Sequence, residues 1–326
     1  MMAPINQFQF GGHCIAALFV AGTPVYALAD GMVHWAGDEP GSAEVHSGLL
    51  TAILSSDRSA ILTGGEDGRV CQIDKFGRTT ELACVPRKWI SAVASGNAGA
   101  FAYGAGRTVW FNDGAGGERS FQHASTVEDI TFSPDGKRIV VARYNGVSIH
   151  DLAADEPSSE LAWKSMNTGV TFSPDGRFLL ARMRESGFHG WRVADGQHMR
   201  MIGYASSISD WSWSAHGEWL ATSGAHAAIV WPFEGDDGPM GKTPLELGAR
   251  DDSTVTAVAC HPARRAVAIG YADGVIQLAD INSDRCSGLK PAGDGEVTSL
   301  AWDVTGTRLA FGCDTGVCGL IDTQAL

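Results

Sequence analysis

The chain has 326 residues, 44% of them hydrophobic, and a formal net charge of −13, from 24 Lys and Arg against 37 Asp and Glu. Phosphate binding depends on basic patches, so this acidic balance argues against a nucleic-acid partner. No apolar run approaches the roughly 20 residues of a membrane helix, no leader is evident and the seven Cys are irregularly placed, so we predict a cytoplasmic protein without a membrane span.

The predicted elements are all β-strands. Residues 6–10 alternate polar and Phe side chains, as expected for a strand. After them the same unit recurs to the end of the chain, with an apolar run, a polar turn, a second run, a Gly-containing turn and a third run, mostly followed by a more polar segment. The first runs begin near Ile15, Leu50, Ile90, Val127, Gly169, Ile208, Val255 and Val297. This pattern predicts eight repeats and almost no helix.

Two repeats contain nearly the same sequence, at residues 131–141 and 171–180, and each copy has a Ser-Pro-Asp-Gly turn. Pro presets the backbone angle of a turn, and Asp and Gly suit the positions after it. The second turn of the repeat also recurs, as Asp30-Gly31, Asp67-Gly68, Asn145-Gly146, Asp273-Gly274 and Thr315-Gly316. Such pairs between apolar runs predict tight hairpins.

These turns, together with third strands that end in Trp or Asp, resemble the WD-repeat β-propeller family, in a divergent, bacterial-type form. The matching ends are Trp35, Asp74, His150-Asp151, Trp191, Trp231, Ile281 and Asp322. The resemblance covers the whole chain and implies a single closed β-propeller domain, residues 1–326, with four-stranded blades. Eight blades are preferred and seven are the alternative. The N-terminal strand 6–10 would complete the last blade, which removes exposed sheet edges.

The sequence also departs from the family. No third strand ends in the full Trp-Asp dipeptide, and only His46 and His123 stand where the family's buried His would fall. We therefore expect the buried hydrogen-bond relay of the family to be incomplete in most blades. Apolar packing between neighbouring sheets must then carry more of the stability.

No catalytic set, cofactor site or metal site is predicted. The segment 235–243 resembles a phosphate-binding loop, but one residue too many separates Gly235 from Gly241, and no strand-loop-helix context surrounds it. Cys-x-x-Cys, His-x-His and Gly-x-Ser-x-Gly are absent. We expect a protein that is not an enzyme, although catalytic groups or a metal gathered from distant blades in a central channel remain an alternative.

The candidate binding site comes from aligning the residue before the second turn. Six repeats have a small residue there, whereas two consecutive repeats have Arg143 and Arg182. Arg184 and Tyr144 follow closely. Each Arg either pairs internally with a carboxylate such as Glu128, Asp129 or Glu185, or forms a cationic patch for a partner.

The resemblance implies that the face with these turns docks partners. The predicted partner-binding residues are Trp89, Arg107, Arg143, Tyr144, Arg182, Arg184, His226, Tyr271, Asp273 and Asp314. Trp89 is either a surface contact or a core residue between blades. The predicted function is a rigid, non-catalytic interaction scaffold, monomeric or within a hetero-complex, that binds a protein or an acidic peptide. The alternatives are an enzyme or ligand binder that uses the central channel, and a purely structural subunit.

Overall fold

The computed structural model describes residues 4–37, 39–153, 159–283 and 285–324. These residues form β-strands, turns and one 3-10 turn, η1 (Asn97–Gly99), as the all-β prediction required. No helix in these ranges is long and apolar enough to cross a membrane. The chain divides into two compact units, Met1–Leu28 with Ile202–Leu326 (the first unit) and Ala29–Met201 (the second unit).

The first unit contains three antiparallel four-stranded sheets and the hairpin β2-β3. The sheet orders are β1-β30-β29-β28, β20-β21-β22-β23 and β24-β25-β26-β27. The strands are β1 (Ile5–Gln9), β2 (Cys14–Val20), β3 (Thr23–Leu28), β20 (Trp211–Trp213), β21 (Trp219–Thr222), β22 (Ala228–Pro232), β23 (Leu245–Leu247), β24 (Val255–Cys260), β25 (Ala266–Tyr271), β26 (Ile276–Asp280), β27 (Cys286–Lys290), β28 (Val297–Trp302), β29 (Arg308–Cys313) and β30 (Val317–Asp322).

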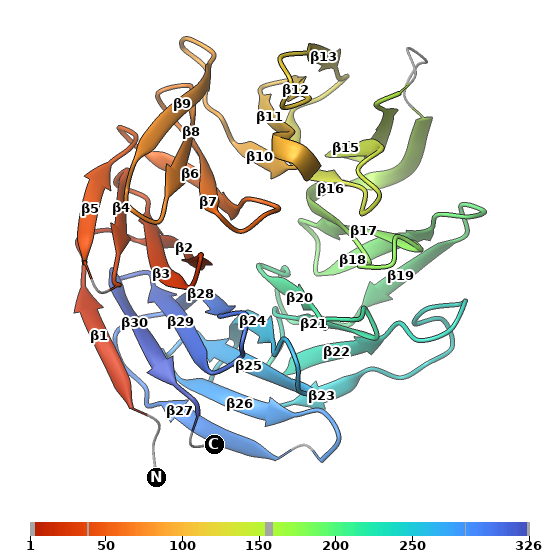
Figure 1. Ribbon diagram of the computed structural model, residues 1–326. Coiled ribbons are helices and arrows are strands. Elements are labelled where there is room, and N and C mark those ends of the chain that lie inside the picture. The colour runs from red at the N-terminus through yellow and green to blue at the C-terminus, as the bar shows by residue number, and fades with distance from the viewer. Residues whose placement is uncertain (1–3, 38, 154–158, 284, 325–326) are drawn as a thin grey trace. The chain divides into compact units, whose positions relative to one another are not determined.

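The N-terminal strand completes the last sheet, as predicted. Strand β1 lies antiparallel to β30, from the pair Ile5↔Ile321 to the pair Gln9↔Val317 (Figure 1). Its apolar residue Ile5 packs against the core cluster of this unit, in which β24–β27 and β28–β30 share Ala257, Val297 and Phe311. The edge of β30 is therefore paired along most of its length, which removes a site for aggregation.

The second unit contains the hairpin β4-β5, two four-stranded sheets and one six-stranded sheet. The sheet orders are β6-β7-β8-β9, β10-β11-β12-β13 and β14-β15-β16-β17-β18-β19. The strands are β4 (Met32–Trp35), β5 (Gly41–Glu44), β6 (Leu49–Leu54), β7 (Ala60–Gly65), β8 (Arg69–Asp74), β9 (Thr79–Cys84), β10 (Ala92–Ser95), β11 (Phe101–Ala105), β12 (Thr108–Asn112), β13 (Glu118–Gln122), β14 (Val127–Phe132), β15 (Arg138–Asp151), β16 (Ser159–Phe172), β17 (Phe178–Met183), β18 (Gly187–Arg192) and β19 (His198–Ile202).

The six-stranded sheet holds two of the sequence repeats. Strands β15 and β16 are each 14 residues long, and each changes partner partway along its length. The first part of β15 pairs with β14, and its last part pairs with the first part of β16. The second part of β16 then pairs with β17. The bend in β15 falls at Asn145 and Gly146, whose φ angles are 68° and 134°.

Counted as continuous hydrogen-bonded sheets, the chain is a seven-blade β-propeller, the alternative number in the sequence analysis, with four strands in every sheet except the six-stranded one. The preferred number, eight, counted sequence repeats, and two of these share the six-stranded sheet because β15 and β16 run on without a break. Each of the eight predicted first runs nevertheless matches a strand or part of one. Within that sheet β16 changes partner from β15 to β17 between Met166 and Asn167, close to the predicted repeat start at Gly169, so the repeat pattern located both the strands and this boundary.

The two Ser-Pro-Asp-Gly turns have the same geometry, as their sequences predict. The hydroxyl of Ser133 donates to Asp135 at 2.5 Å, and that of Ser173 donates to Asp175 at 2.6 Å. In both turns the amide of the Gly donates to the Ser carbonyl at 2.8 Å. The φ of Gly136 is 69°, a value that glycine adopts without strain.

Neighbouring sheets within each unit are packed so closely that small residues are required. A Cβ on Gly104 would lie 2.7 Å from Val127 Cγ1 of the next sheet, and one on Gly270 would lie 2.5 Å from Val297 Cγ1. Both glycines stand near the end of a second strand, where the sequence analysis noted small residues. Their role is to let the sheets approach.

Candidate functional site

The predicted residues of the second unit include two large side chains that are exposed. Trp89 is 63% exposed and Tyr144 is 51% exposed. Trp89 follows a loop that is held against the β7–β8 turn, because the amide of Val85 donates to the carbonyl of Gly68 at 2.8 Å. The interpretation of Trp89 as a core residue is therefore excluded, and its indole stands at the surface.

Tyr144 and Arg184 lie on either side of one methionine. Tyr144 pairs with Met166 in the register of β15 and β16. The amide of Arg184 donates to the Met166 carbonyl at 2.9 Å, and its guanidinium lies 3.5 Å from the Met166 Sδ. The structure thus brings an exposed phenol, a thioether and an exposed guanidinium together. We name Tyr144, Met166 and Arg184 the Tyr144 cluster.

Arg143 is occupied by internal contacts. Its guanidinium pairs with Glu160, its Nε donates to the Ser148 hydroxyl at 2.8 Å, and a further nitrogen donates to the Tyr144 carbonyl at 3.1 Å. Only 13% of its side chain is exposed. Of the two interpretations, internal pairing is the correct one for Arg143. The partner is Glu160, which the sequence analysis did not consider.

Arg182 lies beside Asp129, one of the carboxylates considered. Burial raises the pKa of Asp129, and the positive charge of Arg182 opposes that rise. Arg182 is half-buried and crosses the face of Gly169, where a Cβ would lie 2.4 Å from its Nε. Arg143 and Arg182 therefore do not present two free cations to a partner.

The alignment that placed the two Arg in equivalent positions is wrong by one residue. Both first strands have a β-bulge at the same place, and in this register Gly169 pairs with Arg182 as Asp129 pairs with Ala142, whereas Arg143 pairs with Val127. Successive strand residues point to opposite faces, so the side chains of Arg143 and Arg182 leave their strands on different sides.

Arg107 is exposed in the turn between β11 and β12, and its carbonyl accepts the amide of His123 at 2.9 Å. No contact in the described parts of the chain joins Arg107 to the Tyr144 cluster. It remains a candidate at the surface of the second unit.

In the first unit the structure brings His226 and Asp273 together. Both line a pocket of about 570 Å³, open to solvent, with Asp251 and Asp252. Arg250 donates to both carboxylate oxygens of Asp273, at 3.0 and 2.8 Å, which holds the pKa of Asp273 below its usual value. The sequence analysis missed Arg250, since its partner stands 23 residues away on another strand end.

Two other predicted residues of the first unit lie elsewhere. Tyr271 is completely buried, and its hydroxyl donates to the carbonyl of Gly248, so its prediction as a surface contact is wrong. The ring lies 4.9 Å below the guanidinium of Arg250, which covers it. Asp314 is exposed and accepts the amide of Glu296 at 2.9 Å, which ties the β29–β30 turn to the segment before β28.

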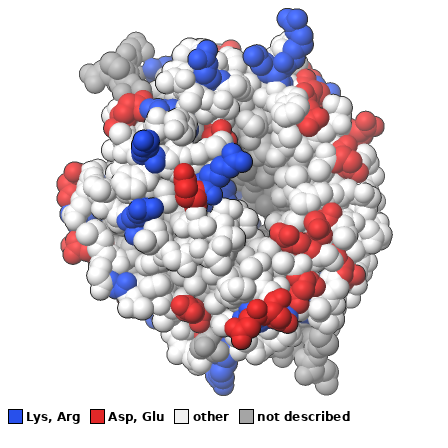
Figure 2. Space-filling view, turned by 180° about the vertical axis from the view of Figure 1, so that it is seen from behind, with Lys and Arg blue, Asp and Glu red and all other residues white. Residues whose placement is uncertain are grey.

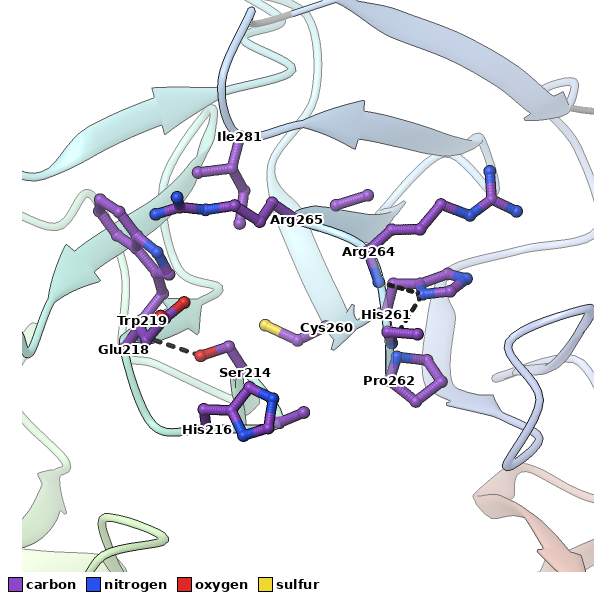
Figure 3. A pocket seen from close by; sticks show the side chains of 13 residues that line it. Ser214, His216, Glu218, Trp219, Cys260, His261, Pro262, Arg264, Arg265 and Ile281 are labelled. Atoms are coloured by element: carbon purple, nitrogen blue, oxygen red, sulfur yellow. Dashed lines mark hydrogen bonds between the residues drawn. The ribbon is translucent and has the colours of Figure 1, made fainter.

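A second pocket of the first unit contains residue types that also occur in catalytic sites. It has a volume of about 410 Å³ including the part open to solvent, and its walls include Ser214, His216, Trp219, Cys260 and His261 (Figure 3). The Cys260 thiol donates to the Ser212 carbonyl at 3.2 Å, and burial raises its pKa to about 12, so it is a neutral thiol near pH 7.

His261 in this pocket is used structurally. Its Nδ1 accepts the amides of Ala263 and Arg264 at 3.0 and 2.9 Å, and its Nε2 donates to the Gly306 carbonyl at 2.9 Å. Ser214 Oγ accepts the amide of Trp219 at 3.0 Å. Within the described residues no hydrogen bond links a histidine to Ser214 or Cys260. The arrangement therefore lacks the nucleophile–base contact that acyl transfer uses.

The segment 235–243 connects β22 and β23 by turns, and no helix follows it. The ammonium group of Lys242 donates to the carbonyl of Glu234. In the described ranges, no group of three or more His, Cys, Asp and Glu side chains is arranged to hold a metal ion. Figure 2 shows Lys and Arg side chains interspersed with Asp and Glu on the visible face.

Comparison with known proteins supports the fold and leaves the family open. No protein-family model matches the chain. The chain is 28% identical over 159 residues to “Centriole proteome protein 16” of Chlamydomonas reinhardtii, a match that spans 47% of this chain and only 8% of that protein. In structure it is similar to the computationally designed Ika8 protein, with a TM-score of 0.78, 19% identity, and coverage of 96% of this chain and 97% of the other. This likeness shows the propeller fold alone. Membership of the WD-repeat family remains a prediction.

Proposed function

We propose that the chain is a non-catalytic scaffold that binds a partner protein through exposed side chains of the second unit. The observation that carries the proposal is the exposure of Trp89 and Tyr144, at 63% and 51%. Burying apolar surface is worth roughly 25 cal/mol per Å², so each exposed ring forgoes stabilisation that a partner could provide.

The residue types also support binding. Trp, Tyr and Arg are the residues that contribute most to protein–protein affinity, and in the Tyr144 cluster Met166 of β16 joins Tyr144 of β15 to Arg184, which follows β17. Trp89 is held on a loop braced by Gly68. Binding residues fixed on rigid sheets lose little conformational entropy when the complex forms.

The test is affinity capture of the tagged full chain from extract of its own cells. A stoichiometric protein should be captured by the wild type and reduced at least tenfold by Trp89→Ala/Tyr144→Ala, because such residues are typically worth 2 kcal/mol or more each. The matched control is Phe76→Ala, which removes an aromatic ring that is 60% exposed but is not among the predicted contacts.

Circular dichroism should show the same fold for all three proteins. An equal yield of the partner with Trp89→Ala/Tyr144→Ala would exclude this surface. A wild-type capture without any stoichiometric partner would argue against the scaffold itself.

A further inference from the structure

The pocket in Figure 3 is formed by the ends of two neighbouring sheets of the first unit. The connection between β20 and β21 supplies Ser214 and His216, and the connection between β24 and β25 supplies Pro262 and Arg265. Trp219 begins β21 and forms one wall. Both connections are short and hydrogen-bonded, which fixes the two sides of the pocket, and a ligand reaches the shielded indole nitrogen of Trp219 when a side chain that covers it moves.

The indole N–H of Trp219 has no acceptor. Its Nε1 is shielded from solvent and makes no hydrogen bond within the residues that the structure describes. A shielded donor without a partner costs roughly 1–3 kcal/mol. Indole nitrogen is a donor only, so the group that would satisfy it must present an acceptor oxygen.

The guanidinium of Arg265, next to this indole, can exchange its present acidic partner for another acceptor. Arg265 extends across the Trp219 ring with its guanidinium carbon 5.5 Å from the ring centroid (Figure 3). Its ion pair with Glu234 is 3.5 Å long between side chains that are 47% and 54% exposed. An exposed pair of this kind is worth little, so a better acceptor can replace Glu234.

We propose that this pocket binds a carboxylate, which pairs with the guanidinium of Arg265 and accepts the indole N–H of Trp219. An anion is favoured over a neutral carbonyl because hydrogen bonds from a guanidinium to an ionised acceptor are roughly twice as strong as bonds between neutral groups. The proposal rests on the scaffold function in one respect: the carboxylate is assigned to an acidic side chain of the partner protein.

The walls fit such a side chain. The polar groups of the lining include Glu218 as well as Arg265, and the apolar part, Pro262, Ala266 and Ile281, can cover the methylene groups of a Glu side chain. The predicted acidic peptide therefore has a receptor at Arg265, whereas the predicted receptor at Arg143 is already neutralised by Glu160.

The test uses N-acetyl-glutamate-methylamide as the probe and the indole N–H resonances of the ¹⁵N-labelled full chain as the readout. The Trp219 resonance is assigned by its loss in Trp219→Phe. It should shift on titration with the glutamate probe and stay unchanged with N-acetyl-glutamine-methylamide, which has the same shape without the charge. Acetate forms a third arm for a free carboxylate.

Two neighbouring arginines provide matched variants. Arg265→Gln should weaken probe binding at least tenfold, whereas Arg264→Gln, whose guanidinium points away from the pocket in Figure 3, should leave it unchanged. No shift of the Trp219 resonance, an equal shift with the glutamine probe, or equal losses in both variants would each overturn the proposal.

Partner capture separates this inference from the scaffold function. If a partner is captured equally by wild type and by Arg265→Gln, the scaffold stands and the carboxylate site on the partner is wrong. If acetate matches the glutamate probe and no partner is captured, the pocket is a site for a free carboxylate and the scaffold function fails.

Discussion

Single residues of this chain substitute for the buried histidine that the family resemblance implies. In one repeat His46 is present, and it joins Asp67 at 3.0 Å to Thr63 at 2.8 Å. In another repeat a tyrosine replaces it. The hydroxyl of Tyr204 hydrogen-bonds to Thr222 at 2.7 Å and accepts the indole N–H of Trp231 at 2.7 Å. The relay is thus retained with a different side chain.

The Tyr204 hydroxyl should contribute measurably to stability. We expect Tyr204→Phe to lower the free energy of unfolding by about 1–3 kcal/mol, because a buried hydrogen-bonding group loses its partner. Urea denaturation measures this. The matched control is Tyr144→Phe, which removes an exposed hydroxyl and should change stability by less than about 0.5 kcal/mol. Equal effects of the two substitutions would show that the Tyr204 relay contributes nothing.

At the scale of the elements, the first strands of neighbouring repeats are joined by side chains that lie in or next to these strands. Asp129 accepts the amide of Val170, Asp210 accepts that of Val258, and Ser299 accepts that of Ala17, each at 2.9 Å. Each of these repeats therefore includes a polar link to its neighbour as well as apolar packing. Either an Asp or a Ser can provide it, so no fixed residue marks it in the sequence.

The close approach of neighbouring sheets gives a prediction for Gly104. Adding one methyl group with Gly104→Ala should destabilise the protein by about 1–3 kcal/mol, because the new Cβ would lie 2.7 Å from Val127 Cγ1. Val127→Ala alone should also destabilise, by leaving a small cavity. The double variant relieves the clash, so its loss of stability should be smaller than the sum of the losses in the two single variants. Strictly additive losses in a double-mutant cycle would contradict the clash.

The sequence predicted the strands well because turns and apolar runs are local signals. The Ser-Pro-Asp-Gly turns and the pairing of β1 with β30 both follow the prediction. The prediction that failed depends on the pairing register of the strands. In the two repeats Phe132 pairs with Ile139 and Phe172 with Leu179, so Ala142 is the residue equivalent to Arg182, and matching Arg143 with Arg182 was off by one residue and put them on the same face. The burial of Tyr271 under Arg250 depends on a contact between distant strand ends.

For the whole molecule, three buried histidines link stability to pH. Burial is the main cause that lowers the pKa of His123 and His150 to about 4 and that of His189 to about 3. Nearby positive charges add to this effect, from Arg143 for His123 and from Arg119 for His150. These imidazole rings stack on aromatic neighbours. The ring centroids of His189 and Trp163 are 3.7 Å apart, and those of His150 and Phe121 are 4.1 Å apart.

The sign of the pH dependence follows from proton binding. The unfolded histidines have a pKa near 6.5. Below that pH they bind protons in the unfolded chain, whereas in the native state they stay neutral until the pH approaches their lowered pKa values. Stability should therefore fall as the pH decreases from about 6.5 toward 4, by roughly 2 kcal/mol for each histidine between pH 7 and pH 5. Urea denaturation at several pH values measures the slope. His150→Phe keeps the ring contact and removes the titrating group. The slope of the free energy of unfolding against pH should therefore decrease by the equivalent of about one bound proton. An unchanged slope in that variant, with its fold intact at pH 7, would show that His150 is protonated equally in both states.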